Sequence, residues 1–169
     1  MSDAGPPLAL AHLFGRGGRE MIDHIPHCRR LDMDVVLLEA CRAVVRLPYR
    51  PELVGDPVRR VVFGGAVTTL LDHAGGLAVF ASLTELTAIA TLDLRIDYLR
   101  AARPDVPLLG EAHCYKRTPN VAFVRASAYE ETPGDPFATC LGTFMLGANA
   151  SESPMAQAIR ARLAGKGSA

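Results

Sequence analysis

Residues 63–82 read FGGAVTTLLDHAGGLAVFAS, and this stretch decides the fold. Gly64 and Gly65 open it. From Ala66 to Ser82, apolar side chains then fall on nearly every side of a predicted helix. A helix that is hydrophobic all round is a buried helix. We therefore predict one long helix at the centre of the domain.

Strands are predicted on both sides of this helix. The clearest is Thr91–Tyr98, in which apolar and polar residues alternate with a strict period of two, as in a sheet covered on one face. Four further stretches are predicted as strands: 35–47, with a helix as the alternative over its first turn, 108–117, 121–129 and 137–146. Short turns make the later strands antiparallel neighbours. The expected fold class is α+β, with an antiparallel sheet wrapped around the long central helix.

A chain of 169 residues predicts one domain. Residues 35–147 form that domain. Residues 1–34 are expected to be a tail with weak helical patterns at 8–14 and 20–25, the second ending at Pro26. Residues 148–169 are expected to be a second tail, with a short helix from Pro154 to Gly165.

Composition excludes several classes of protein. Eighteen basic residues balance eighteen acidic ones, so the chain lacks the basic excess of a nucleic-acid binder. The least charged stretch, 61–84, is long enough to cross a bilayer, but Asp72 lies in its middle. The N-terminus lacks a signal-peptide pattern. We expect no membrane association and a cytoplasmic protein.

The cysteines indicate neither a disulfide framework nor a metal site. Four of them are scattered along the chain without a Cys-x-x-Cys pair, so we expect reduced, mostly buried thiols. The cluster His24, His27 and Cys28 is interrupted by Pro26 and has no second ligand pair at zinc-site spacing. No metal and no cofactor are predicted.

Asp72 is the first candidate for chemistry, because it is the only acidic or basic residue between Val61 and Thr84. A carboxylate among apolar residues is costly unless it is paired or functional, so it is either a structural partner or a general base or nucleophile. The free N–H groups at Gly64 and Gly65 suit an oxyanion. Gly64 and Asp72 lie roughly 12 Å apart along a helix. A site that uses both would therefore combine two subunits related by a two-fold axis.

Two stretches of the chain carry a family resemblance. Residues 63–74, with a Gly-Gly turn and Asp72 nine residues after Phe63, and residues 90–102, which read ATLDLRIDYLRAA, resemble the PaaI-like branch of hotdog-fold acyl-CoA thioesterases. That branch has a His-Gly-Gly turn, an acid nine residues after the His, and a strand of the form T-x-D-x-x-x-x-Y-L-R-P-A. Ala138–Phe144 resembles its last strand, and the resemblance covers about residues 40–147.

The resemblance implies hydrolysis of an acyl-CoA thioester. Asp72 matches the catalytic carboxylate, acting as general base or as nucleophile. Gly64 matches the residue whose N–H polarises the thioester carbonyl, and Thr91 matches the hydroxyl that orients the attacking water. The usual assembly is a dimer, often paired again into a tetramer, with the central helices side by side and the second strand of each chain paired across the interface.

The family's turn His is replaced by Phe63, which removes a ring donor and predicts weaker polarisation of the carbonyl. An Asn that several members carry before this turn is also absent, although Asp56 lies nearby. The predicted substrate-binding residues are Phe63, Gly65, His73 and Arg117. We expect His73 to contact a dimer mate or a backbone carbonyl, because consecutive helical residues do not face each other.

Coenzyme A would bring phosphates, for which the candidate ligands are Arg59, Arg60, Arg100, Arg103 and Arg117, with Arg117 favoured. Leu70, Leu71 and Phe80 are candidates for lining an acyl pocket, but their pattern favours a place in the core. Two alternatives stay open: a non-catalytic acyl-CoA-binding protein, which Phe63 favours, and an acyl-thioester hydratase or dehydratase, which Pro26-His27 favours.

Overall fold

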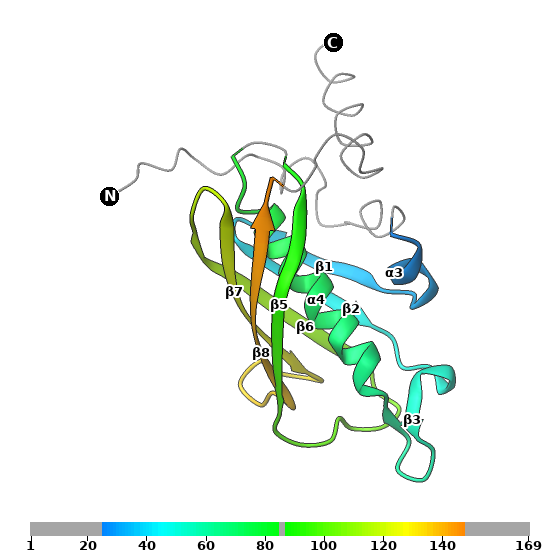
Figure 1. Cartoon of the computed structure of the whole chain (residues 1–169). Coiled ribbons are helices and arrows are strands. Elements are labelled where there is room, and N and C mark those ends of the chain that lie inside the picture. Colours follow the sequence, from blue (N-terminus) through cyan, green and yellow to red (C-terminus); the bar gives the residue numbers. More distant parts are fainter. Residues whose placement is uncertain (1–24, 85–86, 148–169) are drawn as a thin grey trace.

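The computed structural model describes residues 25–84 and 87–147, and a single long helix, α4 (Gly64–Phe80), organises it. The helix packs against all six strands of the main sheet (Figure 1). Most of its side chains are buried, as an apolar circumference requires. The predicted central helix is therefore confirmed. It begins at the glycine pair, two residues before the expected start.

The main sheet is antiparallel throughout and follows the order β1-β2-β6-β7-β8-β5. Its strands are β1 (Asp34–Glu39), β2 (Arg42–Leu47), β5 (Ile89–Tyr98), β6 (Leu108–Arg117), β7 (Val121–Tyr129) and β8 (Ala138–Leu146). This arrangement confirms the α+β class, with an antiparallel sheet around one helix. Strands β1 and β5 form the two edges of the sheet. The prediction that the later strands are neighbours in chain order is wrong for β5, which pairs with β8 and is separated from β6 by two strands.

The prediction of one strand over 35–47 is wrong, because this stretch forms the hairpin β1–β2. The chain reverses at Cys41, whose φ of +63° is uncommon for a residue other than glycine. No Gly, Pro, Asn or Asp marks this reversal in the sequence. The apolar residues of the two hairpin strands therefore follow one another without a turn signal, and the pattern predicted one continuous strand.

Small elements flank the helix. The helix α3 (Pro26–Arg30) begins at Pro26, where the helical pattern was expected to end, because proline is favoured at the first helical position. The segment between β2 and α4 contains the 3-10 helix η1 (Pro51–Leu53), and β3 (Val54–Asp56) pairs with β4 (Val61–Val62). The helical patterns expected at 8–14 and 20–25, apart from Ile25, and at 154–165 lie outside the described residues.

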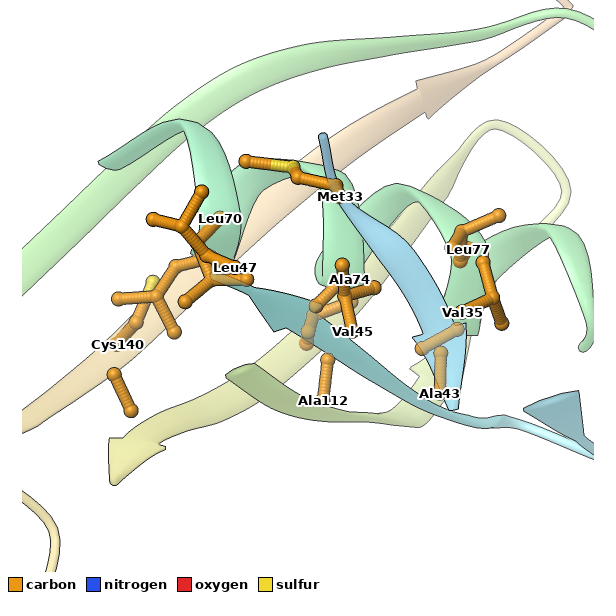
Figure 2. Packing of buried hydrophobic residues seen from close by; sticks show 14 of the residues in the cluster. Met33, Val35, Ala43, Val45, Leu47, Leu70, Ala74, Leu77, Ala112 and Cys140 are labelled. Carbon is orange, nitrogen blue, oxygen red and sulfur yellow. The ribbon is translucent and has the colours of Figure 1, made fainter. Parts of the chain in front are cut away.

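The core lies between α4 and the inner face of the sheet. Figure 2 shows side chains of α4 against those of β1 and β2, with Ala112 of β6 and Cys140 of β8 nearby. Leu70 and Leu71 are completely buried, and Phe80 is 4% exposed. The prediction that these three side chains belong to the core, and not to an acyl pocket, is therefore confirmed.

A bulge interrupts β5 and changes the direction of its side chains. Thr91 pairs with Phe144 and Asp93 pairs with Thr143, so Leu92 is an extra residue with no partner on β8. Phe144 is buried against α4, so Thr91 also points inward. Strict alternation would have placed Thr91 on the outer face with Asp93. Leu92 is 54% exposed, so the predicted covered face is covered only in part.

Candidate active site

Asp72 and Thr91 meet between α4 and β5. The Thr91 hydroxyl donates a hydrogen bond of 2.7 Å to the Asp72 carboxylate. Asp72 is half-buried on the least covered side of α4. We call this the open side of the helix and define it by Gly65, Thr68, Thr69, Asp72 and Gly76. The structure thus brings together two of the three predicted catalytic residues within one chain.

The third predicted catalytic residue, Gly64, begins the helix. Its carbonyl accepts hydrogen bonds of 3.0 Å from the Tyr98 hydroxyl and 3.0 Å from the Thr68 hydroxyl. Within residues 25–84 and 87–147, no acceptor takes the N–H of Gly64 or of Gly65. These free donors lie at the positive end of the helix dipole, where negative charge is stabilised. The geometry therefore suits an oxyanion.

Phe63 covers this end of the helix with its ring. A Cβ built on Gly65 would lie 2.5 Å from its Cε1 atom, and one built on Gly55 would lie 3.0 Å from its Cδ2 atom. Both glycines are therefore needed for the ring to occupy its place. The Phe63 N–H donates to the Leu53 carbonyl at 2.7 Å, which holds the turn without a ring donor.

A cavity of about 490 Å³ adjoins Phe63, and we call it the N-terminal cavity. It lies between α3, η1, β3 and the first turns of α4. Its lining residues are His27, Leu31, Glu52, Leu53, Val54, Gly55, Phe63, Gly65, Ala66 and Thr69. This volume is within the range of about 300–1,000 Å³ typical of small-molecule sites.

His73 does not pair with Asp72. Its Nε2 atom is buried and has no hydrogen-bond partner among the described residues, so the expected contact with a backbone carbonyl is absent there. Burial disfavours the charged ring and lowers the pKa of His73 to about 4. The imidazole is therefore neutral at pH 7.

Four of the five arginines considered for phosphate binding are engaged elsewhere. They form ion pairs: Arg59 with Asp56, Arg60 with Asp105, Arg100 with Glu130 and Asp135, and Arg103 with Glu131. Arg100 also donates two hydrogen bonds, of 2.8 and 2.7 Å, to the two carboxylate oxygens of Glu130. This contact fixes the turn after β7, so Arg100 is a structural residue here.

Arg117 forms no ion pair within the described part of the chain. It lies opposite Ala122 near the end of β6. Burial raises the pKa of the Cys114 thiol, whereas Ser82 and Arg117 beside it act in the opposite direction. Ser82 follows the C-terminal end of α4, so Arg117 lies near the opposite end of the helix from Gly64. The structure does not bring it together with Asp72 within one chain.

Sequence reasoning missed two residues that hold this site. Tyr98 anchors Gly64, and its place on the inner face of β5 was the available signal. Gly55 provides room for the Phe63 ring, for which the sequence offers no local signal.

Among the described residues, no helix is long and apolar enough to span a membrane. No three His, Cys, Asp or Glu side chains of these residues converge as metal ligands.

A long helix inside an antiparallel sheet, with an acid on its open side, defines the chain as a hotdog-fold protein. The sequence profile of the thioesterase superfamily matches residues 60–137. A protein of known crystal structure from Pseudomonas aeruginosa is 40% identical, with a TM-score of 0.70, over 79% of this chain and 98% of that one. The chain has the hotdog fold and is similar to proteins of the thioesterase superfamily.

Two named relatives refine the comparison. The medium/long-chain acyl-CoA thioesterase YigI of Escherichia coli strain K12 is 31% identical over 99 residues, covering 51% of this chain and 64% of that protein. The PaaI protein from the phenylacetic acid degradation operon of Escherichia coli shares the fold. Its TM-score is 0.71 at 16% identity, over 83% of this chain and 98% of that one. The curated relatives are matched over only 43% to 64% of their own lengths.

Proposed function

We propose that this protein hydrolyses an acyl-CoA thioester to a carboxylic acid and coenzyme A. The observation that carries the proposal is the hydrogen bond of 2.7 Å from Thr91 to Asp72 on the open side of α4. A carboxylate held this way keeps one oxygen for a proton or for an acyl carbon. Similarity to the thioesterase superfamily and to the acyl-CoA thioesterase YigI supports the same reaction.

Two routes use the same residues. In the first, Asp72 takes a proton from water, and the hydroxide attacks the thioester carbonyl carbon. The C–S bond breaks, and the coenzyme A thiolate receives the proton. In the second, Asp72 attacks the carbonyl directly and releases the thiolate. Water then hydrolyses the mixed anhydride. In both routes, negative charge develops on the carbonyl oxygen and requires donors.

The donor is the free backbone N–H of Gly64, supplied by a second subunit. One small carbonyl group cannot reach both Gly64 and Asp72 in one chain, because they lie roughly 12 Å apart along α4. Strand β5 is an edge of the sheet, and its neighbourhood exposes Leu92, Tyr98 and Leu99 by 54%, 51% and 60%. We propose that β5 pairs with β5 of a second copy, which removes this edge and sets the two helices side by side.

The first test compares Asp72→Asn with the wild type on a panel of short-chain, long-chain and aromatic acyl-CoAs, following thiol release. Asp32→Asn is the matched control, because Asp32 is exposed, lies outside α4 and β5, and has a positive φ that asparagine also tolerates. We expect Asp72→Asn to lose at least about a hundredfold in kcat, the scale of lost general acid–base catalysis, and Asp32→Asn to keep its activity. Full activity of Asp72→Asn would refute the assigned role.

A second candidate function is acyl-CoA binding without hydrolysis. The observation that favours it is Phe63, whose ring carries no hydrogen-bond donor at the turn that faces the thioester. The same panel separates the two functions. Micromolar binding of acyl-CoA with no thiol release by the wild type would establish the binding protein.

A further inference from the structure

The N-terminal cavity adjoins the Gly64 turn but supplies no reacting group to the proposed bond cleavage, and Leu70, Leu71 and Phe80 are enclosed in the core. We infer that this cavity holds the hydrocarbon part of the acyl group, and that Phe63 determines its preference for extended, unsubstituted chains. The inference deepens the proposed function and rests on it for the identity of the thioester.

The cavity and the carboxylate lie along one side of the helix. Gly65, Thr69 and Asp72 follow one another at spacings of four and three residues, which places them in one row on α4. The first two line the cavity, and the third is the proposed catalytic group. Roughly one helical turn, or about 5 Å, separates Thr69 from Asp72. In the proposed dimer, Gly64 of one subunit holds the thioester carbonyl, and Phe63 and Gly65 on either side of it line the cavity of that subunit. An acyl chain extending from this carbonyl therefore enters the cavity.

Helix α3 borders the same row from the other side. His27 lies 3.5 Å from the Thr69 hydroxyl, measured from its Nε2 atom. The next residue, Cys28, has its pKa raised to about 11, first by burial and then by the negative charge of Asp72. α3 thus borders the cavity through His27, and its next residue lies in the field of the Asp72 carboxylate.

The chemistry of the lining favours hydrocarbon. Leu31, Leu53, Val54, Phe63 and Ala66 supply apolar surface. The polar groups offer few free donors. The Thr69 hydroxyl already donates to the Gly65 carbonyl at 3.0 Å, and Glu52 lies within 3.6 Å of the Arg50 side chain. An acyl group that carries hydroxyl groups would lose hydrogen bonds to water and regain few here.

Phe63 is the residue that determines this preference for unsubstituted acyl chains. Its ring is held between Gly55 and Gly65, yet 63% of the residue is exposed. A fixed aromatic ring loses little conformational entropy when a ligand covers it. Histidine at this position would place a ring donor at the mouth of the cavity, whereas phenylalanine offers only apolar surface.

The test measures kcat/KM for octanoyl-CoA and acetyl-CoA and takes their ratio. We expect Phe63→Ala to lower this ratio by about tenfold or more, the scale of one or two lost methylene contacts. Phe63→Leu keeps apolar bulk and should stay within about threefold of the wild-type ratio, on the same scale. Val58→Ala is the control, because Val58 is 92% exposed and does not line the cavity, and its ratio should not change.

A binding measurement separates this inference from hydrolysis. Titration calorimetry measures the binding of a thioether analogue of octanoyl-CoA, which cannot be hydrolysed, and of coenzyme A alone. Weaker binding of the thioether to Phe63→Ala, with unchanged binding of coenzyme A, supports the cavity even if the wild type cleaves no thioester. Equal losses for octanoyl and acetyl substrates, or unchanged binding of the thioether, would overturn it, because Phe63 would then act only on the turn.

Discussion

Thr91 offers the most direct test of how the active site is assembled. Its hydroxyl donates to the Asp72 carboxylate over 2.7 Å, a distance typical of a hydrogen bond to a charged acceptor. Such a bond contributes about 1.5–3 kcal/mol net. Thr91→Val keeps the shape of the side chain and removes the donor. At about 1.4 kcal/mol per factor of ten, kcat should fall by about 10- to 100-fold.

The assay follows thiol release at saturating acyl-CoA for the wild type, Thr91→Val and Thr91→Ser. Serine retains the hydroxyl, so Thr91→Ser should stay within about threefold of the wild type, less than the loss of a full hydrogen bond. Thermal unfolding of all three proteins controls for folding. Two results would refute the reasoning: wild-type kcat in Thr91→Val, or equal losses in the serine and valine variants.

Three predictions concern stability. In the unfolded chain, the His73 side chain binds a proton below pH 6.5. In the folded protein, its lowered pKa keeps it neutral down to about pH 4. Acid should therefore remove about 3 kcal/mol of stability by pH 4, and urea unfolding of His73→Gln at pH 7 and 4.5 should show less acid sensitivity. Arg100→Met leaves the Glu130 carboxylate without its ion-pair partner and should lower the free energy of unfolding by about 2 kcal/mol, less than the loss expected for a fully buried ion pair. An unchanged midpoint of urea unfolding would contradict this. Gly110→Ala places a Cβ 2.8 Å from Leu70 Cγ and should cost about 1–3 kcal/mol, whereas exposed Gly134→Ala should unfold like the wild type.

The elements predicted most accurately have clear local signals. Strands β6 and β7 match their predicted bounds, because the Thr118-Pro-Asn120 turn separates two β-rich stretches. The hairpin β1–β2 was missed because its turn uses Cys41 at positive φ in place of glycine or asparagine. The arginines illustrate a different limit. Their number is visible in the sequence, but their partners are carboxylates 3 to 45 residues away, which only folding brings close.

The sequence by itself determined the central helix, the antiparallel neighbours β6, β7 and β8 and the choice of Asp72, because periodicity, short turns and an isolated charge are local properties. Tertiary structure alone decided that Thr91 reaches Asp72. A bulge at Leu92 turns Thr91 toward the helix, and the bulge exists only in the pairing of β5 with β8. Tertiary structure also decided that Phe63 and Gly55 shape a cavity. Both results depend on contacts between segments distant in the sequence, and no local pattern encodes them.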